Sequence, residues 1–182
     1  MMKSEIVSFC NKIKNKYCLF LFHNNFGENG EVQYCTFPYC CKLSADIITS
    51  YFKLCFGDKF KYIYTTNSNV YNHAWTLYED DNEKFIIDFT DFQHGIDNEV
   101  REKFIKHKIS DEEILNEISK REVVIDVEET YYYGLDSIMC PKEQQCCGVK
   151  NNTVKNINLS EEKFSEFLKK VSPKIFSETS YN

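Results

Sequence analysis

Proline and glycine are scarce in this chain of 182 residues, which has three prolines and six glycines. No segment is rich enough in either residue to separate two domains, and no internal repeat is present. Apolar runs are also short, and none approaches the roughly 18–20 residues that a membrane-spanning helix needs. We therefore expect one domain over residues 1–182, with a core over about 30–135 and a C-terminal helical extension over about 155–172.

A secretory signal and a basic surface are missing as well. The N-terminal run CLFLF is shorter than the roughly 7–15 apolar residues of a signal peptide, and it leads into His23 and two asparagines. The sequence predicts a cytoplasmic protein, or one delivered as an effector without a conventional signal peptide. The net charge is −6, with both signs interspersed, so neither nucleic acid nor a membrane is an expected partner.

Cysteine is the residue present in excess. The chain has nine cysteines, an odd number, so at least one thiol stays unpaired in a monomer. Without a signal peptide, reduced thiols are the expectation. The cysteines are Cys10, Cys18, Cys35, Cys40, Cys41, Cys55, Cys140, Cys146 and Cys147.

Hydrophobic periodicity predicts two helices followed by strands. Residues 4–17 form an amphipathic helix, and a second helix begins at Cys41, after Pro38, and ends before Gly57. Residues 59–65, 73–78 and 84–90 alternate as strands do, and the acidic turn EDDNE joins the last two into an antiparallel hairpin.

The second half of the chain mixes helix and strand. Ser110 and Glu113 form a capping box for a helix to about residue 120, and residues 121–133 contain one more strand. Residues 140–152 are expected to be a loop, and Ser160 caps a last helix through about Val171. Because the elements do not alternate as βαβ units, the fold class predicted is α+β.

One set of residues is typical of a site with a thiol nucleophile. A thiol is a good nucleophile as thiolate, which a helix N-terminus and a neighbouring imidazole both favour. Cys41 stands where a helix starts, and His73 opens a strand. Asp88 lies on the next strand, and a tight hairpin brings it beside His73 on one face, where a carboxylate holds the imidazole in one tautomer.

These residues resemble a known series. FPYCCKLSADII, then NHAWTLY, then IIDFTDFQ is similar to the Cys…His-Ala-Trp…Asp-x-Thr series of the transglutaminase-like cysteine enzymes, over about 55 residues. The resemblance implies a papain-like core, in which the catalytic helix packs on an antiparallel sheet. It makes Cys41 the nucleophile, His73 the base and Asp88 the orienting acid, and it places Trp75 beside the site.

Some positions depart from the family or leave alternatives open. Tyr39 stands where relatives commonly have glycine, and the oxyanion-hole glutamine of papain falls at Cys35, so only the backbone N–H of Cys41 is assigned as an oxyanion donor. Cys40 competes as nucleophile; Cys41 is preferred because Ala45 matches the small helix residue of the family. The remaining candidates are Trp75, Cys40 and Tyr39 for substrate binding, His94 and His23 as weaker bases, and Thr90 and Gln93 for loop structure.

The resemblance implies a cysteine enzyme that forms a thioester with a protein or peptide substrate and needs no cofactor or metal. It acts as a protease, a glutamine deamidase or a transglutaminase. One alternative is a non-catalytic papain-like binding module. Another is a structural zinc protein built on the cysteines at 35, 40, 41, 140, 146 and 147, whose spacing fits zinc poorly. The oligomeric state is not predicted.

Overall fold

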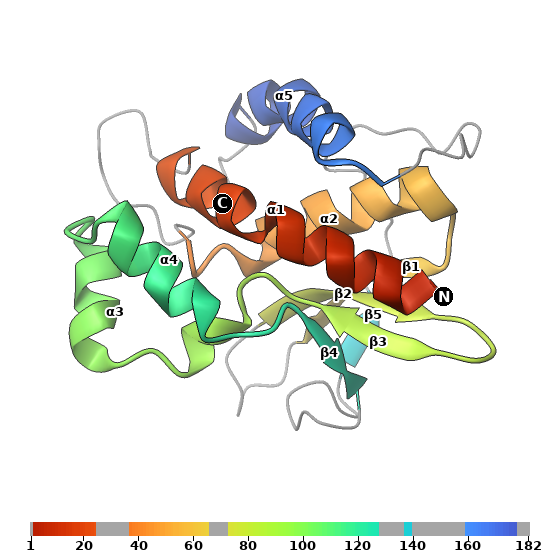
Figure 1. The fold of residues 1–182 in the computed structure, drawn as a ribbon, viewed down its shortest axis with the longest axis horizontal. Helices are drawn as coiled ribbons and strands as arrows, with labels where there is room; N and C mark the ends of the chain where they lie inside the picture. Colours follow the sequence, from red (N-terminus) through yellow and green to blue (C-terminus); the bar gives the residue numbers. More distant parts are fainter. Residues whose placement is uncertain (1, 25–36, 66–72, 128–136, 140–158, 178–182) are drawn as a thin grey trace.

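The computed structural model describes residues 2–24, 37–65, 73–127, 137–139 and 159–177. Within these ranges the protein is α+β: α1, α2 and α5 lie over one face of a single antiparallel sheet, and α3 and α4 lie beyond one end of it (Figure 1). The elements are α1 (Met2–Asn24), α2 (Cys41–Phe56), β1 (Phe60–Thr65), β2 (His73–Glu79), β3 (Lys84–Ile87), the 3₁₀ helix η1 (Asp91–His94), α3 (Asn98–Ile105), α4 (Asp111–Ser119), β4 (Val124–Asp126), β5 (Ser137–Met139) and α5 (Glu161–Ser177).

The sheet has the strand order β4-β3-β2-β1-β5, and every neighbouring pair is antiparallel. The predicted hairpin of β2 and β3 is confirmed, with Leu77 opposite Ile86. Its turn is held by the Asp80 carboxylate, whose Oδ1 accepts hydrogen bonds of 2.9 Å from the backbone N–H groups of Asn82 and Glu83. This side-chain mimic of a backbone turn explains why so acidic a segment reverses the chain.

Strand β3 ends at Ile87, three residues earlier than predicted. The cause is Asp88, whose Oδ1 accepts from the backbone N–H and the hydroxyl of Thr90, both at 2.8 Å. This local turn removes residues 88–90 from the strand. The backbone N–H of Asp88 still donates to the carbonyl oxygen of Val123, the residue before β4, at 2.8 Å.

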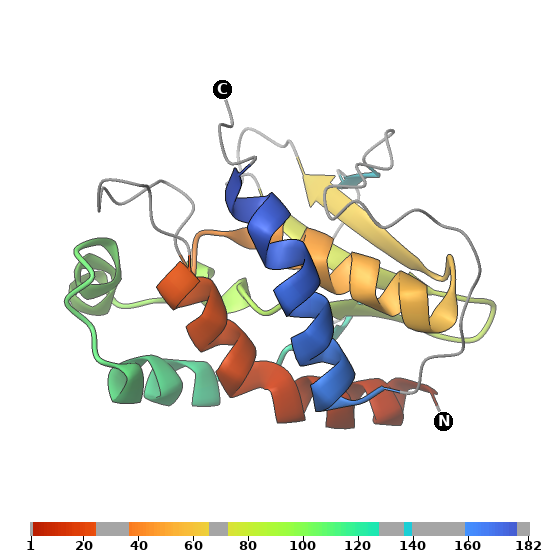
Figure 2. The ribbon, with the colours of Figure 1, turned by 90° about the horizontal axis from the view of Figure 1, so that it is seen from above.

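Helix α1 is longer than predicted and continues through the run CLFLF to Asn24. The reason is the buried stripe, which does not stop at Tyr17 but continues through Cys18, Leu21 and Phe22. In Figure 2, α5 crosses over α1 and α2, and Phe164 of α5 packs edge-on against Phe9 and Tyr17 of α1. The helix is therefore stabilised by tertiary packing along most of its length.

Helix α2 packs on β1 and β2, and buried hydroxyls tie it to the sheet. Thr76 of β2 is fully buried and donates to the carbonyl oxygen of Ala45 at 3.2 Å. Since that bond uses the only hydroxyl proton of Thr76, Thr49 of α2 donates to Thr76 at 2.8 Å. These bonds fix the start of α2, at Cys41, relative to the strand that begins at His73.

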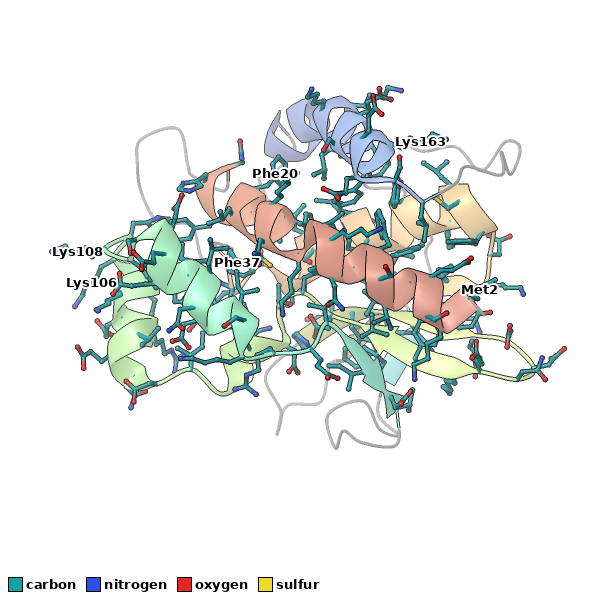
Figure 3. All side chains as sticks on the ribbon, viewed as in Figure 1. Met2, Phe20, Phe37, Lys106, Lys108 and Lys163 are labelled. Atoms are coloured by element: carbon teal, nitrogen blue, oxygen red, sulfur yellow. The ribbon has the colours of Figure 1, made fainter. Side chains whose placement is uncertain are left out.

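The remaining predicted elements are described in part. The capping box of α4 is confirmed, with Ser110 and Glu113 bonded reciprocally. Of the strand predicted within residues 121–133, the structure has β4 at Val124–Asp126. Residues 140–152 and the last five residues lie outside the described part. Figure 3 shows Phe37 in the interior, where its ring packs on Phe92, and Lys106 and Lys108 at the outer edge.

Within the described helices, none combines the length and the apolar character that crossing a bilayer requires.

We expect Thr76→Val to lower the free energy of unfolding by about 1–3 kcal/mol, because it removes the hydroxyl that joins β2 to α2 and leaves the buried hydroxyl of Thr49 without this partner. Urea denaturation measures the difference. Thr76→Ser keeps the hydroxyl and is the matched control, expected to lose clearly less stability. Equal losses in the two variants would mean that the methyl group, and not the hydroxyl, holds α2 to the sheet.

Candidate active site

A buried ion pair lies at the start of β2. The Nε2 atom of His73 is 2.5 Å from Oδ2 of Asp88, and both side chains are 2% exposed. His73 is the first residue of β2, and Asp88 follows the last residue of the neighbouring β3. The hairpin turn therefore brings together two residues that are 15 positions apart.

Asp88 is held from both sides. Its Oδ1 accepts the two bonds from Thr90, so Oδ2 alone is turned toward the imidazole. The carboxylate can only accept hydrogen bonds, so Nε2 of His73 must carry the proton that is shared between them. This arrangement sets the tautomer of the ring and leaves Nδ1 as the atom that can take or give a proton.

Cys41 lies against the same imidazole. It is the first residue of α2, it is 7% exposed, and it packs with Ala45 and Ala74. Cys41 interacts with this ring electrostatically, since it is among the groups that raise the pKa of His73. Of the two ring nitrogens, Nε2 faces Asp88 and Nδ1 faces Gln93. The three residues predicted as nucleophile, base and carboxylate thus belong to one region of the structure.

Electrostatics favour a charged ring. Burial alone lowers the pKa of His73, but the charge and hydrogen bond of Asp88, with smaller contributions from Cys41, outweigh it and raise the pKa to about 10. Burial acts in the opposite sense on Asp88, and there too the partner wins: the imidazolium and the bonds from Thr90 lower the pKa of the carboxyl. Each group keeps the other ionised.

Gln93 is a member of the site that the sequence interpretation missed. It was expected only to shape the loop, but its Nε2 atom is 2.9 Å from Nδ1 of His73. The residue lies on η1, five positions after Asp88. The signal that could have found it is the spacing Asp-x-Thr-x-x-Gln, which returns the chain toward the carboxylate after one short turn.

The residues predicted to bind substrate take different positions. Trp75 is 2% exposed, packs with Ile63 and Ile86, and has its ring centroid 5.8 Å from that of His73, so it forms a wall beside the imidazole. Cys40 belongs to the main hydrophobic core. Tyr39 is half-buried beneath the guanidinium of Arg101, which lies 5.7 Å from the ring centroid.

The competing candidates lie at different positions in the fold. Cys41, and not Cys40, packs in the cluster beside β2 that contains Ala74. His23 is at the end of α1, exposed and 2.9 Å from Asp111, so it does not share a site with either cysteine. His94 lies on η1, and its side chain is outside the described part of the structure.

A zinc site is not found where the structure can be described. Over residues 2–24, 37–65, 73–127, 137–139 and 159–177, no three His, Cys, Asp or Glu side chains are grouped to hold a metal ion. The described cysteines are free thiols, Cys40 and Cys41 among them. The other four cysteines of the zinc alternative lie outside these ranges, so that alternative stays a prediction.

A hollow of about 350 Å³ lies beyond η1, between the start of α3 and the end of α4. It contains none of the three predicted catalytic residues, and its walls hold no cysteine or histidine. The residues that line it are Phe92, Gly95, Ile96, Asp97, Val100, Glu117, Lys120 and Arg121.

Comparison of the chain with models of protein families, with curated proteins and with solved structures finds no match. The resemblance to transglutaminase-like enzymes therefore depends on the residues of this chain and on their geometry alone.

We expect Asp88→Asn to lower the free energy of unfolding by about 3 kcal/mol near pH 6, because the buried imidazolium loses its counterion. The pKa of His73 rises from 6.5 to about 10 on folding, so the stabilisation is complete below pH 6.5 and is lost as the pH rises through 10. On the acid side it is lost as the pH falls below 3.8 through the lowered pKa of Asp88.

Urea denaturation of both proteins between pH 5 and pH 10 measures this difference. Asp126→Asn is the control, since Asp126 pairs with Lys3 at the surface and its loss is expected to change stability by less than about 1 kcal/mol. If the difference in unfolding free energy between wild type and Asp88→Asn stayed constant up to pH 10, the pair of His73 and Asp88 would not be ionised.

Proposed function

We propose that this chain is a cysteine enzyme of the transglutaminase-like, papain-like kind, which acts on an amide or acyl group of a protein or peptide. The observation that carries the proposal is the buried pair of His73 and Asp88, with Cys41 at the start of α2 close enough to raise the pKa of the imidazole. The packing of α2 on two antiparallel strands, with the thiol at the helix start and the imidazole at a strand start, supports a papain-like core.

The chemistry follows from the proton-carrying atoms. Nδ1 of the neutral imidazole first takes the proton of Cys41, which gives the thiolate and the charged ring that the raised pKa of His73 favours. The sulfur then attacks the carbonyl carbon, while Nε2–H stays bonded to Asp88. Nδ1 then gives the proton to the departing amine or ammonia, and a thioester remains on Cys41. Water or a second amine resolves the thioester by losing its proton to Nδ1, and the thiol is restored. No cofactor is required for these steps.

The start of α2 supplies a place for the oxyanion. The first N–H groups of a helix have no acceptor within the helix, and here the first intrahelical bond runs from Ser44 N to the carbonyl oxygen of Cys40. Cys40 precedes the helix but makes no side-chain capping bond to its first turn. The N–H of Cys41 and those that follow it are therefore the donors for the negative oxygen of the tetrahedral intermediate.

Alkylation by iodoacetamide gives a first test that needs no substrate. We expect Cys41 to react at least tenfold faster at pH 6 than Cys10, Cys18 or Cys55. Burial raises the pKa of the Cys10 and Cys18 thiols well above the usual range and that of Cys55 to about 11, so these three stay protonated. Mass spectrometry of peptides after short exposure gives the individual rates. Equal rates at all four positions would contradict an activated Cys41.

The activity itself is tested with glutamine-containing peptides. We expect wild-type protein to release ammonia from them, with or without a fluorescent primary amine that becomes attached, and Cys41→Ala to lose at least a hundredfold in rate. Cys40→Ala is the matched control and should retain the activity if it folds, which circular dichroism checks. Activity that survives in Cys41→Ala and disappears in Cys40→Ala would move the nucleophile by one residue.

A further inference from the structure

The imidazole of His73 has both ring nitrogens occupied. Nε2 is 2.5 Å from the Asp88 carboxylate, and Nδ1 is 2.9 Å from the side-chain nitrogen of Gln93. Since the carboxylate cannot donate, Nε2 carries a proton, and in the neutral ring Nδ1 has only its lone pair. In the neutral ring the Gln93 amide therefore donates to Nδ1, the atom that receives the proton of Cys41, whereas in the charged ring Nδ1 carries a proton and needs an acceptor.

Gln93 is held at this place by its own backbone and by its neighbour. Its backbone N–H donates to the carbonyl oxygen of Thr90 at 3.1 Å, which makes η1 a continuation of the turn that holds Asp88. The adjacent Phe92 is buried against Phe37 and Phe104, with ring centroids 5.0 and 6.0 Å away. The backbone bond of Gln93 and the packing of Phe92 thus hold the amide against the imidazole.

The groups that face this imidazole come from four elements or turns. They are Cys41 at the start of α2, Asp88 after β3, Gln93 on η1 and, on β2 itself, Trp75. One step behind Asp88 lies Cys18 of α1, whose thiol is kept protonated by burial and by the Asp88 charge, which raise its pKa. Of these groups, the carboxamide is the one able both to donate and to accept a strong hydrogen bond without changing its charge.

We propose that Gln93 is the positioning residue of this site: its amide binds Nδ1 through N–H when the imidazole is neutral and, after a half-turn, through its carbonyl oxygen when the imidazole is charged. This inference rests on the proposed function, because it names the group that orients the base through the reaction. When the proton moves from the Cys41 sulfur to Nδ1, the S–H bond breaks and the N–H bond forms. The thiolate and the imidazolium are the only charges created, because the amide stays neutral. The turned amide and the thiolate then share the new proton.

The amide chemistry explains why neither a purely apolar nor a charged side chain would serve. An apolar residue leaves Nδ1 with the thiol as its only partner and lets the ring tilt away. A carboxylate accepts from Nδ1–H but also places a negative charge beside the thiolate, which disfavours the thiolate. An apolar and a charged side chain at this position therefore predict different pH profiles for the reactivity of Cys41.

The experiment compares Gln93→Glu and Gln93→Met with wild type by the rate of Cys41 alkylation between pH 4 and pH 10, and by ¹⁵N NMR of the labelled imidazole rings. The signal of His73 among the four histidines is assigned from the spectrum of His73→Asn. Asn98→Asp adds the same charge at the exposed start of α3 and is the control for net charge. Thermal denaturation checks that each variant folds.

We expect Gln93→Glu to move the midpoint of the alkylation profile upward by at least one pH unit, while Nδ1 of His73 stays protonated to higher pH than in wild type. For Gln93→Met we expect a several-fold lower alkylation rate, a midpoint within about half a pH unit of wild type, and a changed Nδ1 shift of the neutral ring. Profiles and Nδ1 signals unchanged in both folded variants, or moved equally by Asn98→Asp, would overturn the proposal.

Neither readout involves turnover, so the role of Gln93 and the proposed function fail separately. Missing ammonia release with a shifted profile would refute the enzyme and keep the positioning role. Ammonia release that depends on Cys41 but not on Gln93 would support the enzyme and refute the positioning role.

Discussion

The buried pair of His73 and Asp88 is the interaction on which the site depends. Taking a carboxylate and an imidazole out of water is unfavourable unless each satisfies the other and the remaining atoms find partners. Here Oδ2 bonds with Nε2, and Thr90 bonds with Oδ1. The hairpin, the early end of β3 and the turn after it together place these hydrogen-bond partners.

One short segment carries several functions at once. The residues from Asp88 to Gln93 end a strand, hold a carboxylate, begin a 3₁₀ helix and return an amide to the same imidazole. Phe92 anchors this segment in the core. Because polar groups of one turn hold both ring nitrogens, the orientation of the ring is coupled to the packing of the turn, as expected for a preorganised site.

Local chemistry explains which predictions succeeded. The start of α2 after Pro38, the hairpin and the capping box of α4 are encoded by residues near one another in sequence, so turn and capping rules find them. The predicted length of α1 was wrong because CLFLF is ambiguous alone, and in the structure Cys18, Leu21 and Phe22 of this run are buried in the core. The predicted end of β3 was wrong because the Asp88 carboxylate bonds to Thr90 and turns the chain out of the strand after Ile87.

By itself, the sequence determined the α+β class and the identity and order of the thiol, imidazole and carboxylate, because these follow from residue types and short-range periodicity. Only the tertiary structure decided that Cys41 and not Cys40 lies in the cluster beside β2, and that Trp75 is buried beside the imidazole. It also decided that the side chain of Gln93 reaches Nδ1. The physical reason is that these contacts join separate elements. Their geometry depends on how α2, β2 and η1 pack, which no local pattern of residues specifies.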